Sequence, residues 1–241
     1  MLLTGGARRW GAWRAMAAGA ILAAVIVIAV RVFSPALRLW LGHLYLVAGY
    51  WIPALASAGT GGTPFERWLE ATHARWRPLL NAAPAWLVHA GEVAYPLCFP
   101  MVPAAFLVVW TAGNDLDLNR FWLAVLIGGL ASYGSLPWLV ARPPRRLPGA
   151  RPREHAIARF NAGLLSRISH NLITFPSGHV GVSIAAALCV ATVSPLAGLA
   201  FALVAVAISI GAVTGGYHYV MDVVTGLAVG ALGALVAIVA V

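Results

Sequence analysis

Residues 177–214 read SGHVGVSIAAALCVATVSPLAGLAFALVAVAISIGAVT and contain no Asp, Glu, Lys or Arg. A bilayer core of ~30 Å is crossed by ~20 helical residues, so this stretch is long enough for two crossings. Ser194-Pro195 divides it near the middle, and proline is accepted in the first turn of a helix but not in its interior. We therefore expect a helical hairpin in lipid, with both of its ends on the same side of the membrane.

Four further apolar stretches extend this pattern, at residues 15–33, 84–112, 121–140 and 222–241. The chain is 61% hydrophobic and 10% charged, and its mean hydropathy is +0.85, which excludes a water-soluble globular protein. The fold class that we expect is all-α, a polytopic membrane bundle of about six transmembrane helices. A seventh candidate, 39–58, contains His43 and Pro53 and is suited either to crossing the membrane or to lying in its interface.

Two polar stretches interrupt the apolar pattern. Residues 59–83 carry Trp68, Leu69 and Trp76 between charged residues at helical spacing, which predicts an amphipathic helix on the membrane surface. Residues 141–176 carry seven Arg and connect two predicted helices. We assign 1–241 to a single membrane domain, with the N-terminal helix or helices and the amphipathic segment in 1–83 and the main bundle in 84–241.

The charge pattern limits the possible partners. The formal net charge is +9, and all 16 basic residues are Arg. Because these residues lie between apolar spans and not in a separate basic module, we expect membrane lipids and no nucleic acid as partners. The run that follows Arg8, Arg9 and Arg14 lacks a small-residue cleavage site, so it is expected to be a retained helix. Cys98 and Cys189 lie in apolar segments and are expected to be core residues without a disulfide.

The peptide Phe175-Pro176-Ser177-Gly178-His179 stands where the Arg-rich loop becomes an apolar helix. Ser177 suits a helix start, Gly178 allows a ligand to approach the backbone, and free N–H groups at a helix start attract anions. His179 would then lie at the edge of an anion site. A capped helix with a surface histidine is the alternative for this peptide alone.

His218 and Asp222 lie at the junction of the last two predicted helices. Residues four apart meet on one face of a helix, and a carboxylate on one imidazole nitrogen leaves the other nitrogen free to attack. A His–Asp pair that only joins two helices is the alternative. Ionisable residues inside a membrane are rare and usually functional, which favours the catalytic interpretation.

The motif that comes first along the chain, before those of His179 and His218, is Arg142-Pro143-Pro144-Arg145, which follows an apolar helix. The guanidinium groups of Arg142 and Arg145 are suited to binding phosphate oxygens, and the prolines stiffen the loop that carries them. An Arg at the end of a helix can also simply anchor the helix in the headgroup region.

In this order and at these membrane boundaries, the three motifs resemble those of the type 2 phosphatidic acid phosphatase family of membrane phosphatases. The resemblance covers residues 121–241 and implies a metal-independent enzyme without cofactors. It implies His218 as the nucleophile, Asp222 as its orienting partner and His179 as acid and then base. It further implies that phosphoryl oxygens are bound by Arg142, Ser177 and the backbone of Gly178, and Arg145 is a further candidate.

The chain departs from this family at two cationic positions. Ser135 stands where the first motif normally has Lys, and Gly211-Ala212 stand where the third normally has Ser-Arg. Without these cations, the third motif resembles that of the inositol phosphorylceramide synthase branch, whose members transfer a phospho-headgroup between lipids. Gly178, in contrast, fits the plain phosphatases better. The expected function is therefore a lipid phosphatase, with a lipid phosphotransferase as the alternative and a non-catalytic lipid-binding or transport protein as the second alternative.

Several points stay open at this stage. A metal site built from His179, His218 and Asp222 is conceivable but less favoured, because Asp222 is better placed to orient His218. Six helices with a cytoplasmic N-terminus predict a multi-pass protein of the bacterial inner membrane with an extracytoplasmic site, and a crossing by 39–58 would reverse that side. The lipid substrate and the oligomeric state are not indicated by the sequence.

Overall fold

The computed structural model describes residues 34–56, 62–147, 155–170 and 172–241, together with scattered positions between 13 and 32. The described residues are helical or lie in turns and loops, which confirms the all-α class. The predicted helix at 15–33 falls mostly outside the described residues. The surface-exposed Leu44, Val47 and Leu203 illustrate the apolar exterior that is expected of a protein in lipid.

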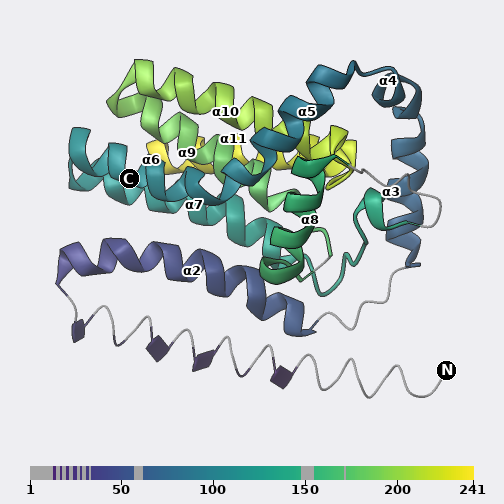
Figure 1. Cartoon of the computed structure of the whole chain (residues 1–241). Helices are drawn as coiled ribbons and strands as arrows, with labels where there is room; N and C mark the ends of the chain where they lie inside the picture. The colour runs from purple at the N-terminus through teal and green to yellow at the C-terminus, as the bar shows by residue number, and fades with distance from the viewer. Residues whose placement is uncertain are drawn as a thin grey trace.

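The hairpin expected at 177–214 is present as α9 (Gly178–Val193) and α10 (Pro195–Thr214), with the break at Ser194. Helix α9 is central and packs against α6 (Cys98–Ala112), α7 (Asp115–Gly134), α10 and α11 (Val220–Ala240). These helices run side by side (Figure 1). A Cβ atom on Gly230 of α11 would lie 2.3 Å from the backbone oxygen of Gly181, so glycine permits the close packing of α9 and α11.

Three stretches are long and apolar enough to cross a membrane among the described residues: Ala85–Ala112, Pro195–Thr214 and Val220–Ala240. Gly178–Val193 is apolar but shorter. The chain is thus a membrane protein, and the expected count of six transmembrane helices is not confirmed. The stretch 84–112 is not one regular helix, since α5 (Ala85–Ala94) and α6 are joined by the 3-10 turn η1 (Tyr95–Leu97), where Pro96 lies.

The helix predicted at 121–140 is shifted towards the N-terminus. Its start is fixed by a capping box, in which the Asn114 side chain accepts hydrogen bonds from the N–H groups of Leu116 and Asp117, and the Asp117 carboxylate accepts one from the N–H of Asn114. The seventh candidate, 39–58, forms helix α2 (Pro35–Ala56), which packs along α7 (Figure 1).

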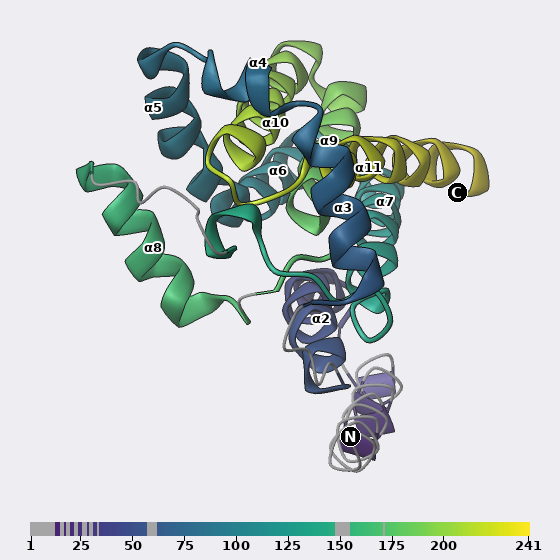
Figure 2. The same ribbon diagram turned by 90° about the vertical axis from the view of Figure 1, so that its right-hand side faces the viewer.

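The polar stretches form helices at one end of the bundle. Residues 59–83 contain α3 (Pro64–Ala74) and α4 (Arg77–Asn81), and the 141–176 segment contains the 3-10 turn η2 (Pro144–Arg146) and an additional helix, α8 (Ala156–Ile168). Helix α3 buries Leu69 against Ala141, Ile173 and Tyr219 and leaves Trp68 half exposed, as an amphipathic helix does. Seen along the bundle, α3 and α8 stand on different sides of this end (Figure 2).

Candidate active site

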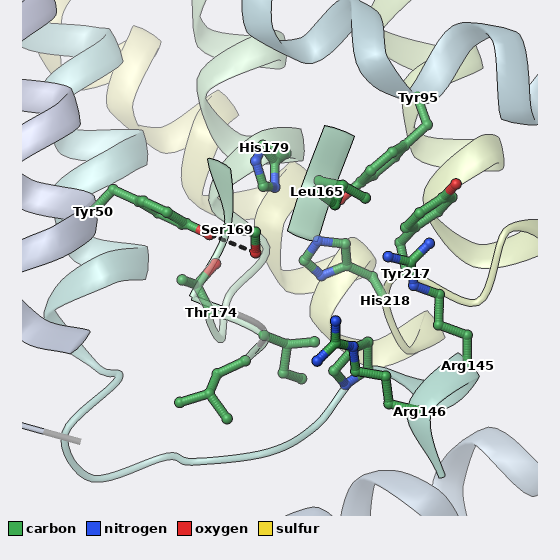
Figure 3. A pocket seen from close by; sticks show the side chains of 13 residues that line it. Tyr50, Tyr95, Arg145, Arg146, Leu165, Ser169, Thr174, His179, Tyr217 and His218 are labelled. Atoms are coloured by element: carbon green, nitrogen blue, oxygen red, sulfur yellow. Dashed lines mark hydrogen bonds between the residues drawn. The ribbon is translucent and has the colours of Figure 1, made fainter. Parts of the chain in front are cut away.

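The three motifs meet in one cavity of about 30 Å³ at this end of the bundle. The first motif contributes Arg145 and Arg146, the second His179 and the third Tyr217 and His218 (Figure 3). A cavity of that size has room for one or two water molecules. The other lining side chains include Tyr50 of α2 and Thr174, and no lining residue in the described part of the chain is an Asp or a Glu.

The contact expected between His218 and Asp222 is present. His218 Nδ1 lies 2.9 Å from Asp222 Oδ2, and both side chains are buried. The two residues do not share a helix, however, because α11 begins at Val220 and His218 precedes its N-cap, Tyr219. With Nδ1 bonded to the carboxylate, His218 presents Nε2 as its free nitrogen.

A tight turn places His218 at the end of α10. Gly216 adopts a φ of +67°, in the left-handed region that favours glycine, and the N–H groups of Tyr217 and His218 both donate to the carbonyl oxygen of Ala212 at 2.9 Å. The N–H of Arg145 donates to the carbonyl oxygen of Gly216 at 3.0 Å. The loops of the first and third motifs are therefore bonded to each other directly.

His179 lies in the first turn of α9, opposite His218. The centroids of the two imidazole rings are 5.8 Å apart. Around His179 lie Tyr50, Tyr95 and Phe99, at ring-centroid distances of 6.3, 5.9 and 5.6 Å. Its Nδ1 is buried without a hydrogen-bond partner in the described structure, which leaves His179 open to a bound ligand or water.

Arg145 is held over the ring of Tyr217, with its Cζ atom 4.1 Å from the ring centroid. The other face of Tyr217 stacks on Tyr95, at a centroid distance of 3.8 Å and an interplanar angle of 6°. The Tyr217 hydroxyl donates to Glu92 Oε2 at 2.5 Å, and Asn161 Nδ2 donates to the same oxygen at 2.9 Å. This arrangement fixes the position of the guanidinium group beside the cavity.

Arg146 brings a second cation to the same cavity. Burial, and next the neighbouring charge of Arg145, lower the pKa of Arg146 below its ordinary value. Two guanidinium groups that face a cavity without a lining carboxylate favour the binding of an anion between them.

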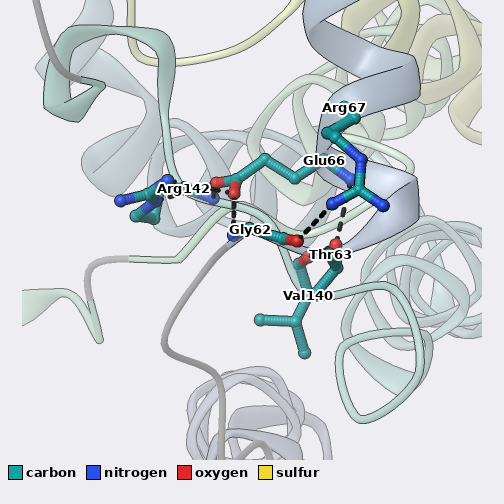
Figure 4. A network of polar contacts seen from close by, with 6 residues as sticks. All are labelled: Gly62, Thr63, Glu66, Arg67, Val140 and Arg142. Atoms are coloured by element: carbon teal, nitrogen blue, oxygen red, sulfur yellow. Dashed lines mark hydrogen bonds and ion pairs between the residues drawn. The ribbon is translucent and has the colours of Figure 1, made fainter.

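Arg142, which was predicted to bind phosphate, has a different partner. Its Nε and Nη2 atoms donate to the two carboxylate oxygens of Glu66 on α3 at 2.9 and 3.1 Å, and its backbone N–H donates to Glu66 at 2.8 Å (Figure 4). Burial alone would raise the pKa of Glu66, but the hydrogen bonds from Arg142 and Gly62 outweigh it and lower that pKa below its ordinary value. Arg142 does not line the cavity, because it joins the first-motif loop to α3.

Ser177 and Gly178 also have structural partners. Ser177 is fully buried as the N-cap of α9, and its N–H donates to the carbonyl oxygen of Asp222 at 2.8 Å. The N–H of Gly178 donates to Thr174 Oγ1 at 3.1 Å, and a Cβ atom on Gly178 would lie 2.2 Å from the ring of Tyr133. Gly178 is thus explained by close packing, and neither residue lines the cavity.

The two positions where cations were missing lie outside the cavity. The Ser135 hydroxyl donates to the carbonyl oxygens of Ser132 and Phe175. Ala212 is buried in a cluster with Tyr95 and Tyr217. In the described part of the chain, no three His, Cys, Asp or Glu side chains are grouped so that they could hold a metal ion.

Sequence reasoning missed Glu66, Glu92, Tyr95 and Tyr217. A signal for the two carboxylates exists, since the chain has only seven acidic residues and a buried carboxylate needs partners. The tyrosines carried no comparable signal, because aromatic residues are common in apolar helices and at membrane interfaces.

The chain was compared with known proteins, solved structures and protein families. No curated protein and no solved structure matches the chain. The family model of the PAP2 superfamily, the type 2 phosphatidic acid phosphatases, matches residues 63–236. This range includes α3, the first-motif loop, His179 and the His218–Asp222 pair. Because this match covers well over half of the chain, the protein belongs to the PAP2 superfamily.

Proposed function

We propose that the protein is a membrane phosphatase that cleaves a phosphomonoester or diphosphate of a lipid through a phosphohistidine on His218. Superfamily membership supports phosphatase activity on phosphate esters. The observation that carries the proposal is that His218, which is paired with Asp222, lines a cavity that His179 and two arginines also line.

In the first step, His218 Nε2 attacks phosphorus and the bond from phosphorus to the ester oxygen breaks. His179, protonated, donates its proton to the leaving oxygen, so the lipid alcohol departs from a phosphomonoester and the lipid monophosphate departs from a diphosphate. Asp222 keeps the proton on Nδ1 of His218 and stabilises the positive charge that develops on the ring. In the second step, His179 takes a proton from water, the water oxygen bonds to phosphorus and the P–N bond breaks.

Phosphoryl transfer depends mainly on positioning and on neutralisation of charge. We assign these tasks to Arg145 and Arg146, in place of the two cations that the chain lacks. Arg145 lies over the ring of Tyr217, and Tyr217 directly precedes His218 in the sequence. One short segment therefore positions both the Arg145 guanidinium and Nε2 of His218. Arg142 has no such role in the proposal, because its Nε and Nη2 atoms donate to Glu66 and its side chain does not line the cavity.

With a phosphodiester lipid as the donor, the donor's lipid alcohol would leave and His218 would carry the phosphoryl group with its headgroup still attached. A second lipid alcohol that attacks phosphorus instead of water would then break the P–N bond and complete a phospho-headgroup transfer. The sequence of the third motif favours this second candidate, and the chemistry of the first step is common to both. Six crossings with the N-terminal Arg residues in the cytoplasm would place the site on the extracytoplasmic face of a bacterial inner membrane, whereas an additional crossing by α2 would place it on the same face as the N-terminus.

The test is phosphate release by the purified protein from lipid phosphates in detergent with a chelator present. A panel of phosphatidate, phosphatidylglycerophosphate, polyprenyl diphosphate and phosphatidylinositol covers the substrate classes, and vanadate should inhibit. His218→Ala should abolish release and the phosphoenzyme, whereas full activity in His218→Ala would refute the mechanism. Products that form only when a lipid alcohol is added would favour the transferase.

A further inference from the structure

A second, larger cavity adjoins the proposed catalytic cavity. It has a volume of about 380 Å³, within the range of ~300–1,000 Å³ that is typical of ligand sites. Two side chains, those of Tyr50 and His179, line both cavities. The larger space therefore begins where the proposed acid and base of the reaction lies.

The larger cavity is a groove between α2 and the first half of α6. One wall is formed by Leu46, Val47 and Trp51 of α2, and the other by residues of α6 that include Phe99 and Val102. Aromatic side chains lie at its far end, where the ring centroid of His43 is 4.7 Å from that of Trp122 and 5.2 Å from that of Phe106. Apolar side chains predominate, so the groove suits a hydrocarbon chain.

The direction of the groove matches the direction of a lipid molecule. His43 and Tyr50 are two helical turns apart on α2, so the groove extends about 10 Å along the bundle. Helix α2 runs beside α7 (Figure 1). Arg145 and Arg146 lie in the loop that follows α7, at the end of the helices, where headgroups are found. A lipid placed here has its phosphate at the arginines and its chain parallel to the helices, as in the bilayer.

We propose that this groove binds the apolar chain of the lipid phosphate while the phosphate occupies the catalytic cavity. The inference rests on the proposed function and extends it by assigning chain recognition to α2. Helix α2 precedes residues 63–236, which match the superfamily, so one wall of the groove lies outside the matched part of the chain. Tyr50, which donates to Ser169 Oγ at 3.0 Å, stands at the boundary between chain and headgroup.

The test compares two substrates that share a phosphate and differ only in their chain, butyl phosphate and hexadecyl phosphate. Val47→Trp fills the groove from a position that is 58% exposed, so the fold should tolerate the change. We expect kcat/KM for hexadecyl phosphate to fall about tenfold, ~1.4 kcal/mol, with butyl phosphate unaffected. Leu203→Trp on α10, at an exposed position away from the groove, is the matched control and should change neither rate.

Equal rates for hexadecyl phosphate in wild type, Val47→Trp and Leu203→Trp would refute the groove while leaving the phosphatase proposal intact. Failure of the wild type to release phosphate from any lipid phosphate would instead refute the proposed function.

A second measurement does not depend on folding of the variant or on turnover. Wild-type protein is photolabelled with hexadecyl phosphate that carries a diazirine within its chain. Labels on residues 43–51 or 98–103 support the proposal, and labels confined to α10 or α11 overturn it.

Discussion

Arg142 and Arg145 are three residues apart on one loop, yet the structure predicts opposite consequences when each is changed to alanine. The Arg145 side chain faces the cavity over Tyr217, whereas Arg142 is bonded to Glu66. Arg145→Ala should lower catalytic efficiency and leave stability nearly unchanged. Arg142→Ala should lower stability, with a smaller effect on the rate.

The magnitudes follow from the contacts. A hydrogen bond to a charged group contributes ~1.5–3 kcal/mol, so the loss of Arg145 should lower kcat/KM roughly 10- to 100-fold. Removing one partner of a fully buried ion pair costs ~3–5 kcal/mol. The Arg142 side chain is 33% exposed and Gly62 still donates to Glu66, so for Arg142→Ala we expect about half of that, ~2 kcal/mol.

The assay measures phosphate release and the midpoint of thermal unfolding on the same detergent preparations. Each variant serves as the control for the other, because both remove one guanidinium from the same loop. A fall in kcat/KM for Arg142→Ala at an unchanged midpoint, together with normal activity of Arg145→Ala, would show that Arg142 and not Arg145 binds the phosphate. It would also refute the assignment made from the Glu66 contact.

Three further changes test the site. Asp222→Asn should lower kcat by ~10²–10⁴ with little change in KM, because the His218 imidazole loses its orienting carboxylate. Steady-state kinetics measure this effect, and an unchanged kcat would contradict the orienting role of Asp222. Tyr217→Phe should lower the unfolding midpoint through loss of the bond to Glu92 but keep KM, whereas Tyr217→Leu should raise KM because Arg145 loses its ring. The folded-state pKa of Glu66 lies below the ordinary value of 4.5. The ionised Glu66 carboxylate therefore stabilises the folded protein fully above pH 4.5, and this contribution is lost as the pH falls through the folded-state pKa. Unfolding midpoints measured across acid pH should therefore fall less steeply for Glu66→Gln than for wild type.

The sequence predicted those features that depend on local pattern. The hairpin of α9 and α10 follows from a long uncharged run with one proline. The contact between His218 and Asp222 was also predicted, although the helical spacing behind that prediction does not apply, because His218 precedes α11. The helix start at Asn114 was missed because the capping residues precede the apolar run. Helix α8 in the polar segment 141–176 was also missed, because an amphipathic helix there differs little in composition from an Arg-rich loop.

The partners of the arginines were not predictable in the same way. Arg142 and Glu66 are 76 positions apart, and a tertiary contact at that separation leaves no periodic signal. Arg142 and Arg145 therefore looked equivalent as phosphate ligands in the sequence. The structure distinguishes them because α3 places a carboxylate beside one and the third-motif turn places a tyrosine ring beside the other.

The turn at Gly216 connects the two halves of the proposed chemistry. It directs Tyr217 towards Arg145 and presents His218 to Asp222, and its carbonyl oxygen accepts the backbone N–H of Arg145. A side chain at Gly216 would be strained by the φ of +67° and would approach the Cβ atom of Arg145 to 3.3 Å. The proposed nucleophile and its neighbouring cation are thus set by one short segment. This linkage would bring positive charge to Nε2 of His218 although the chain lacks the two motif cations that the family resemblance implies.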